Sequence, residues 1–168
     1  MLKIFNTLEP FFKDNYRKIN VREYARIMKI SPPSASTVLE KLHKEDLLTR
    51  EKEKVYNYFT ANRNNRTMVI LNKGYWDKRL KELADYIENE AIADAIVLFG
   101  SVAKLEITPQ SDIDIAIITK SKKILDFSTF EKGLKRNIQA FYFESLDKIP
   151  KPLRLNIING HVLRGYLK

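Results

Sequence analysis

Two aspartates, Asp112 and Asp114, are the residues of this chain whose spacing most directly suggests chemistry. They stand two positions apart, at the start of the apolar run that continues over 115–118. Residues i and i+2 of a strand point to the same face, so the two carboxylates would lie side by side. Like charges at that separation repel, and one should lose its charge unless a cation lies between them. Mg²⁺ prefers such oxygen ligands and often adds substrate phosphates to its shell.

Gly100 and Ser101 form a second feature, between the apolar run 95–99 and a short stretch with a helical pattern. Glycine lets a backbone approach a ligand closely, and the N–H groups at a helix start favour phosphate. A phosphate clamp and a carboxylate pair on neighbouring strands together indicate nucleotide chemistry. The alternative is a tight turn followed by a solvated Asp-x-Asp at a strand edge.

The stretch from residue 92 to 168 resembles the DNA polymerase β-like nucleotidyltransferase superfamily. Its signature is an apolar residue, Gly-Ser, a spacer of roughly ten residues, then Asp-apolar-Asp-apolar. This chain matches it from Phe99 to Ile115, and Ser111 also fits the minimal nucleotidyltransferase branch. The resemblance implies metal-dependent transfer of a nucleotidyl group from a nucleoside triphosphate, with Mg²⁺ or Mn²⁺ as cofactor. The implied nucleotide-binding residues are Gly100, Ser101, Lys104 and Ser111, and the implied metal-binding and catalytic residues are Asp112 and Asp114.

The chain departs from the superfamily pattern at two positions. Where members often carry a glycine, this chain has Leu105. Active members usually carry a third carboxylate at the start of a later strand, and the matching residue in the run 138–143 is Gln139. An amide oxygen is neutral and binds Mg²⁺ less strongly than a carboxylate. Two outcomes stay open: an active enzyme, or a domain that binds metal and nucleotide with weak or no catalysis.

Residues 1–62 carry a different pattern. Apolar residues recur with helical spacing over 21–28 and 35–42, on either side of a Ser-Pro-Pro turn. Two further runs around the charged tip 51–54 then predict a β-hairpin. This order resembles the winged helix-turn-helix family, which implies binding to double-stranded DNA. The alternative is a winged helix that serves protein contacts or dimerisation alone.

Side chains expected on the outer face of the second helix and on the hairpin are small hydrogen-bond donors and cations. Such residues suit base edges in the major groove and backbone phosphates. The residues predicted to bind DNA are Ser34, Thr37, Lys41, Lys44, Arg50, Lys52 and Lys54.

The predicted fold class is α+β. An apolar stripe with helical spacing from Trp76 to Ile87 predicts a helical connector, and Gly74 is a candidate break in it. The predicted domains are a winged helix-turn-helix over 1–62, the connector over 63–91, and a small α/β nucleotidyltransferase domain with a mixed sheet over 92–168. Within the last domain the sequence predicts strands at 95–99, 113–118 and 138–143, and helices near 101–105, 127–135 and 153–159.

The composition limits the classes of protein to consider. The chain has 168 residues and a net charge of +9, and both of its halves are basic. That balance suits a protein that handles nucleic acid or nucleotides, although it can serve solubility alone. No cysteine is present, which excludes disulfides and thiolate metal sites. No apolar run has membrane length and no signal-peptide pattern appears, so we expect a cytoplasmic protein that does not enter a membrane.

Three functions fit these observations. The first is a nucleotidyltransferase. The second is a DNA-binding transcriptional regulator whose nucleotidyltransferase domain is weak or inactive and senses a ligand. The third is an antitoxin, since minimal nucleotidyltransferases are often paired with a small helical toxin-like protein. A homodimer is expected if the DNA site is palindromic.

Overall fold

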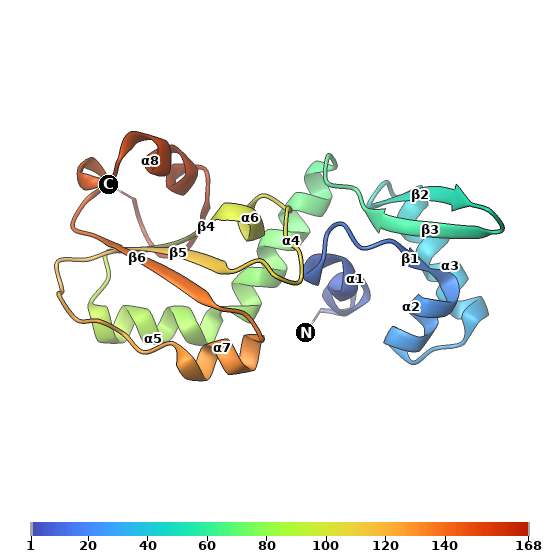
Figure 1. The fold of residues 1–168 in the computed structure, drawn as a ribbon, viewed down its shortest axis with the longest axis horizontal. Helices are drawn as coiled ribbons and strands as arrows, with labels where there is room; N and C mark the ends of the chain where they lie inside the picture. The colour runs from blue at the N-terminus through green and yellow to red at the C-terminus, as the bar shows by residue number, and fades with distance from the viewer. Residues whose placement is uncertain (1, 168) are drawn as a thin grey trace. The chain divides into compact units, whose positions relative to one another are not determined.

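The computed structural model describes residues 2–167, which divide into two compact units (Figure 1). The first unit extends to Asn72 and also includes Leu105–Pro109. The second comprises Lys73–Lys104 and the chain from Gln110 onward. The short segment Leu105–Pro109 therefore belongs to the first unit, although both of its neighbours in sequence belong to the second.

The first unit begins with a helix, followed by a strand, two helices and a hairpin. The elements are α1 (Lys3–Lys13), β1 (Ile19–Asn20), α2 (Val21–Met28), α3 (Pro32–Lys44), β2 (Leu48–Glu53) and β3 (Tyr56–Ala61). The strands form an antiparallel sheet in the order β1-β3-β2. The two helices and the hairpin expected from the sequence lie where the pattern predicted them.

Local sequence explains where the middle helices begin. The Asn20 side chain accepts a hydrogen bond from the backbone N–H of Glu23 at the start of α2. Ser31 does the same for Ser34 at the start of α3, where a proline occupies the first helical position. Both are preferred N-cap residues, and proline at that position loses no intrahelical hydrogen bond.

Helix α1 was not predicted. It carries a fully buried apolar face that includes Leu8, Phe11 and Phe12. The Tyr24 hydroxyl of α2 donates to the Thr7 carbonyl of α1 at 2.8 Å. Helix α1 is therefore part of the core of the first unit.

Two helices follow the hairpin, α4 (Arg66–Arg79) and α5 (Lys81–Ala91). Gly74, the candidate for a break or kink, does not break the helix, because α4 continues through it and the interruption falls at Leu80, with φ −98° and ψ 5°. The apolar stripe of α5 is buried as predicted, with Leu83 and Ile87 at or near zero exposure. No helix among residues 2–167 is both long and apolar enough to cross a membrane.

The second unit is built on a four-stranded mixed sheet. Its strands are β4 (Ala95–Phe99), β5 (Ile113–Ile118), β6 (Ile138–Phe143) and β7 (His161–Gly165), in the order β6-β5-β4-β7. Strands β5 and β6 run parallel and the other pairs are antiparallel. The remaining elements are α6 (Gly100–Ala103), α7 (Ser128–Leu134), the 3₁₀ turn η1 (Leu146–Lys148) and α8 (Lys151–Ile158). The three predicted strands are confirmed to the residue, and the predicted helices differ from these at their ends.

Helices cover both faces of this sheet, which explains why β4 is buried along its whole length. Figure 1 shows α5 and α7 on one side and α8 on the other. Val97 and Ala116 belong to the core cluster on the α8 side, together with Ile157 of α8. A strand buried on both faces needs continuous apolar sequence, and β4 has it.

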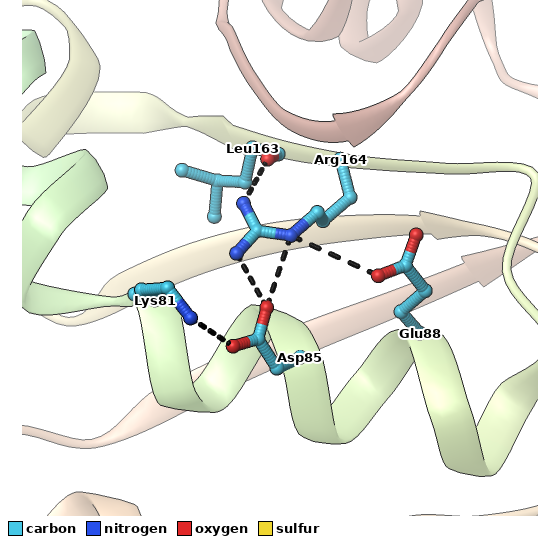
Figure 2. A network of polar contacts seen from close by, with 5 residues as sticks. All are labelled: Lys81, Asp85, Glu88, Leu163 and Arg164. Carbon is cyan, nitrogen blue, oxygen red and sulfur yellow. Dashed lines mark hydrogen bonds and ion pairs between the residues drawn. The ribbon is translucent and has the colours of Figure 1, made fainter.

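A polar network joins the edge strand β7 to α5 (Figure 2). The Arg164 guanidinium lies 2.5 Å from an Asp85 carboxylate oxygen and 3.8 Å from Glu88. Lys81 contacts the other Asp85 oxygen at 2.7 Å. These hydrogen bonds, first from Lys81 and then from Arg164, lower the pKa of the Asp85 carboxyl. The network holds an exposed strand edge against the helix.

Candidate active site

The sheet brings Asp114 into register with two neighbouring strands. Asp114 lies opposite Phe99, the last residue of β4, and beside Gln139, the second residue of β6. Asp112 comes two residues earlier, directly before β5, and both aspartates are half-buried. The two carboxylates therefore lie at one end of the sheet, where the polypeptide leaves β4 and enters β5.

Gly100 is in direct contact with Asp114. Its φ is +69°, and a Cβ atom added there would lie 2.0 Å from Asp114 Oδ2. The glycine is needed both for its left-handed backbone and for the space that the carboxylate occupies. The two features of the sequence motif, Gly-Ser and Asp-x-Asp, thus meet in one place.

The electrostatics of the site centre on Asp114. Burial raises the pKa of its carboxyl, and the nearby Asp112 carboxylate raises the pKa further. Both causes disfavour the ionised form, and a cation between the carboxylates would oppose both. The two carboxylates form an oxygen donor pair, which suits a hard divalent cation.

Asp112 is held by two side-chain amides, one from β6 and one from the residue just before it. Gln139 Nε2 donates to Asp112 Oδ2 at 2.5 Å, and Asn137 Nδ2 donates to Asp112 Oδ1 at 3.1 Å. Residue 139 therefore lies beside the aspartates, as the sequence alignment of β6 required. Asn137 was missed, because its position just before a strand gives no signal without knowledge of the parallel pairing.

The other predicted nucleotide-binding residues lie on the chain between Gly100 and Asp112. Ser101 is half-buried in α6. The Ser111 carbonyl accepts a hydrogen bond from Arg136 Nη1 at 2.6 Å. The Lys104 ammonium donates to the Asn156 side chain of α8 at 2.9 Å. Arg136 is a second residue that the sequence reasoning missed, and its charge lies next to the Asp112 peptide.

No group of three or more His, Cys, Asp or Glu side chains placed to share a metal ion occurs among residues 2–167. Within the nucleotidyltransferase motif, the possible protein ligands for a metal ion are the carboxylates of Asp112 and Asp114. Any metal ion bound there would need ligands from its substrate or from water.

In the first unit, the seven residues predicted to bind DNA are all exposed on α3 and the hairpin. Arg50 forms an ion pair with Glu40 at 2.9 Å, and Lys41 lies 3.9 Å from Glu45. The Ser34 and Ser31 hydroxyl oxygens lie 2.9 Å apart. Part of the positive charge predicted for this surface is thus already compensated by glutamates.

The first unit also contains an open groove of about 430 Å³ that the sequence reasoning did not predict. It is lined by Asn20, Arg22, Glu23, Arg26 and Tyr56. The two arginines stand four residues apart on α2 and so share one helical face. That spacing was the available signal, but it also fits an ordinary solvated face.

Comparison with known proteins identifies the second unit. The family model described as "Polymerase beta, Nucleotidyltransferase" matches residues 81–165, which is half of the chain. The match runs from α5 to β7 and includes Gly100, Asp112 and Asp114. A comparison with curated proteins finds no match. On the strength of the family match, the chain belongs to the polymerase β nucleotidyltransferase family.

Proposed function

We propose that the second unit binds a nucleoside triphosphate together with Mg²⁺ or Mn²⁺ and transfers a nucleotidyl group to a hydroxyl acceptor. The observation that carries this proposal is the contact between Gly100 and Asp114, with Asp112 alongside. It joins a backbone able to approach phosphate to a pair of carboxylates that repel each other without a cation.

In this proposal Asp112 and Asp114 hold the metal ion, and the Gly100 and Ser101 backbone lies against the phosphates. When bound, the metal would neutralise charge on the triphosphate and on the attacking hydroxyl. The acceptor oxygen forms a bond to the α-phosphorus, pyrophosphate leaves, and the hydroxyl proton passes to solvent or to an aspartate. Such transfer depends on positioning and charge compensation more than on covalent chemistry by the protein.

Gln139 decides how strong that catalysis is. Its amide donates to Asp112, so part of the compensation that a metal would supply already comes from the protein. A neutral side chain adds no attraction for the metal, and we infer slower transfer than a three-carboxylate site would give. The same observation supports a second candidate function, in which the domain binds nucleotide as a regulatory ligand without transfer.

Incubation of the full chain with labelled ATP, CTP, GTP and UTP, with Mg²⁺ or Mn²⁺ and candidate acceptors, tests the enzymatic proposal. The double variant Asp112→Asn/Asp114→Asn should abolish transfer. Asp147→Asn is the matched control, because that carboxylate is 94% exposed and belongs to the same unit. Transfer by the double variant at the wild-type rate would refute the assignment of these residues.

We further propose that the first unit is a winged helix-turn-helix that binds double-stranded DNA. The order of its helices and hairpin supports this, as do the exposed Lys41 and Lys44 on α3. Gel shifts with the region upstream of its own gene, at two salt concentrations, test the proposal. Specific binding should weaken steeply as salt rises. Equal, weak binding to every duplex would argue for a unit that contacts protein instead.

A further inference from the structure

The segment Leu105–Pro109 separates the two halves of the nucleotidyltransferase motif. It follows the Gly-Ser of α6 and precedes Asp112 by only a few residues. Yet this segment belongs to the first compact unit, whereas the motif on both sides of it belongs to the second. Any change in the first unit that moves the segment therefore acts on the chain that enters the candidate site.

One buried side chain in the first unit fastens this segment. Asn15 is completely buried, and its backbone N–H donates to the Ile107 carbonyl at 2.9 Å. Its side-chain oxygen accepts from the Ile107 N–H at 2.8 Å. Its amide nitrogen donates to the Phe11 carbonyl of α1 at 2.6 Å. Asn15 thus pairs with Ile107 as a strand neighbour would, and ties it to α1.

Leu105 strengthens the same attachment. Its φ is +59°, in the left-handed region that favours glycine. The glycine of the superfamily pattern would adopt this backbone conformation without strain. The leucine side chain is completely buried, as is that of Ile107. Apolar burial on this scale offsets the backbone strain, so the residue that departs from the family pattern serves as an anchor.

Among the residues of the candidate site, Asp112 is the one that movement of this segment would displace most. Asp114 is fixed within β5 by its pairing with β4 and β6. Asp112 precedes the strand and is held by side-chain hydrogen bonds from Gln139 and Asn137 instead of by strand pairing. The strand pairing begins one residue later, where the Ile113 N–H donates to the Asn137 carbonyl at 2.9 Å. A loosened segment would therefore displace Asp112 and weaken the adjoining Ile113 hydrogen bond before it disturbed the rest of the sheet.

We propose that Asn15 is a positioning residue for the metal and nucleotide site, acting through Leu105–Pro109 on Asp112. This role rests on the proposed function of the second unit. It makes the first unit a regulator of the second, because a ligand that shifts Asn15 changes metal affinity. By thermodynamic linkage, metal and nucleotide then change the affinity of the first unit for its own ligand.

The test compares three variants of the full chain: Asn15→Ala, Leu105→Gly and the control Leu42→Ala. Leu42 is buried in α3 of the first unit and takes no part in the hydrogen bonds between Asn15 and Ile107, so its truncation lowers stability and leaves those bonds in place. The first readout is hydrogen exchange of the Ile113 amide without metal, and the second is Mn²⁺ affinity well below the unfolding temperature. We expect Asn15→Ala to speed exchange at Ile113 and to weaken Mn²⁺ binding between about twofold and thirtyfold.

The control should leave both readouts near wild type at an equal loss of stability. If Asn15→Ala and Leu42→Ala change Ile113 exchange equally, the role of Asn15 is only structural and the inference fails. If Asn15→Ala does not fold, Leu105→Gly is judged by the same criteria. If Asn15→Ala speeds Ile113 exchange but the wild-type chain binds no Mn²⁺, the attachment of Leu105–Pro109 through Asn15 is supported and the proposed function is refuted. The two failures are therefore distinguishable.

Discussion

Replacing Gly100 with alanine is the sharpest perturbation that the site offers. The new Cβ would lie 2.0 Å from Asp114 Oδ2 and 2.9 Å from its Cγ, so the carboxylate must move. The left-handed backbone costs alanine about 1 kcal/mol more than glycine. Overpacking adds about 2 kcal/mol. For a chain of this size, a total of about 3 kcal/mol lowers its melting temperature by about 6–12 °C.

The same displacement should weaken Mn²⁺ binding by about tenfold or more, which is the usual effect of disturbing a ligand's support. Gly133→Ala is the matched control, because a Cβ there meets nothing within 4 Å and the residue lies in helix α7. It should stabilise the chain by up to about 1 kcal/mol and leave Mn²⁺ binding unchanged. Calorimetric melting and Mn²⁺ titration measure both effects. A Gly100→Ala variant as stable as wild type, with equal Mn²⁺ affinity, would refute the contact between Gly100 and Asp114.

Four further results are expected. Asp114→Asn should raise the free energy of unfolding at pH 7 without metal, because it removes a half-buried charge beside Asp112; a lower value in urea titration would contradict this. Gln139→Asp should tighten Mn²⁺ binding by about tenfold, or 1.4 kcal/mol. An unchanged Mn²⁺ affinity in titration calorimetry would contradict this. The pKa of Asp85 is lower in the folded chain than in the unfolded chain, where it is about 3.9. This difference stabilises the fold at pH values above about 3.9, and the stabilisation is lost as the pH falls through the folded pKa. Asp85→Asn should therefore make unfolding less sensitive to acid below pH 4, whereas a steeper dependence would exclude this contribution. Lys44→Ala should weaken DNA binding uniformly and reduce the salt slope by about 1, and an unchanged slope would remove Lys44 from the interface.

The sheet of the second unit was predictable because its strands have unusually clear sequence. The runs 95–99 and 113–118 are apolar almost throughout, and only strands covered on both faces tolerate that pattern. Gly-Ser directly follows the first run, and Asp-x-Asp lies at the start of the second. The sequence therefore implied that both features lie at one end of the sheet. The position of Gln139 beside Asp112 followed from the parity of β6 once β6 was aligned with the family.

Other features depend on contacts between residues far apart in sequence. Asn137 and Arg136 reach the site only because β6 runs parallel to β5. Helix α1 carries Pro10 within it and begins without a side-chain cap, so local signals for it are poor. Gly74 stays helical because a single glycine costs a helix only about 1 kcal/mol. That Leu105–Pro109 belongs to the first unit could not be predicted, since it requires the pairing of Asn15 with Ile107.

We propose above all that Asp112 and Asp114 share a metal ion with a nucleotide bound at Gly100 and Ser101. A crystal structure of the full chain soaked with a non-hydrolysable nucleoside triphosphate and Mn²⁺ tests it most directly. The claim predicts an anomalous manganese peak within coordination distance of both carboxylates, with the triphosphate along the start of α6. Gln139 should then either present its oxygen to the metal or still donate to Asp112. Nucleotide bound elsewhere, or a site that keeps both amide hydrogen bonds to Asp112 and shows no manganese, would contradict the claim.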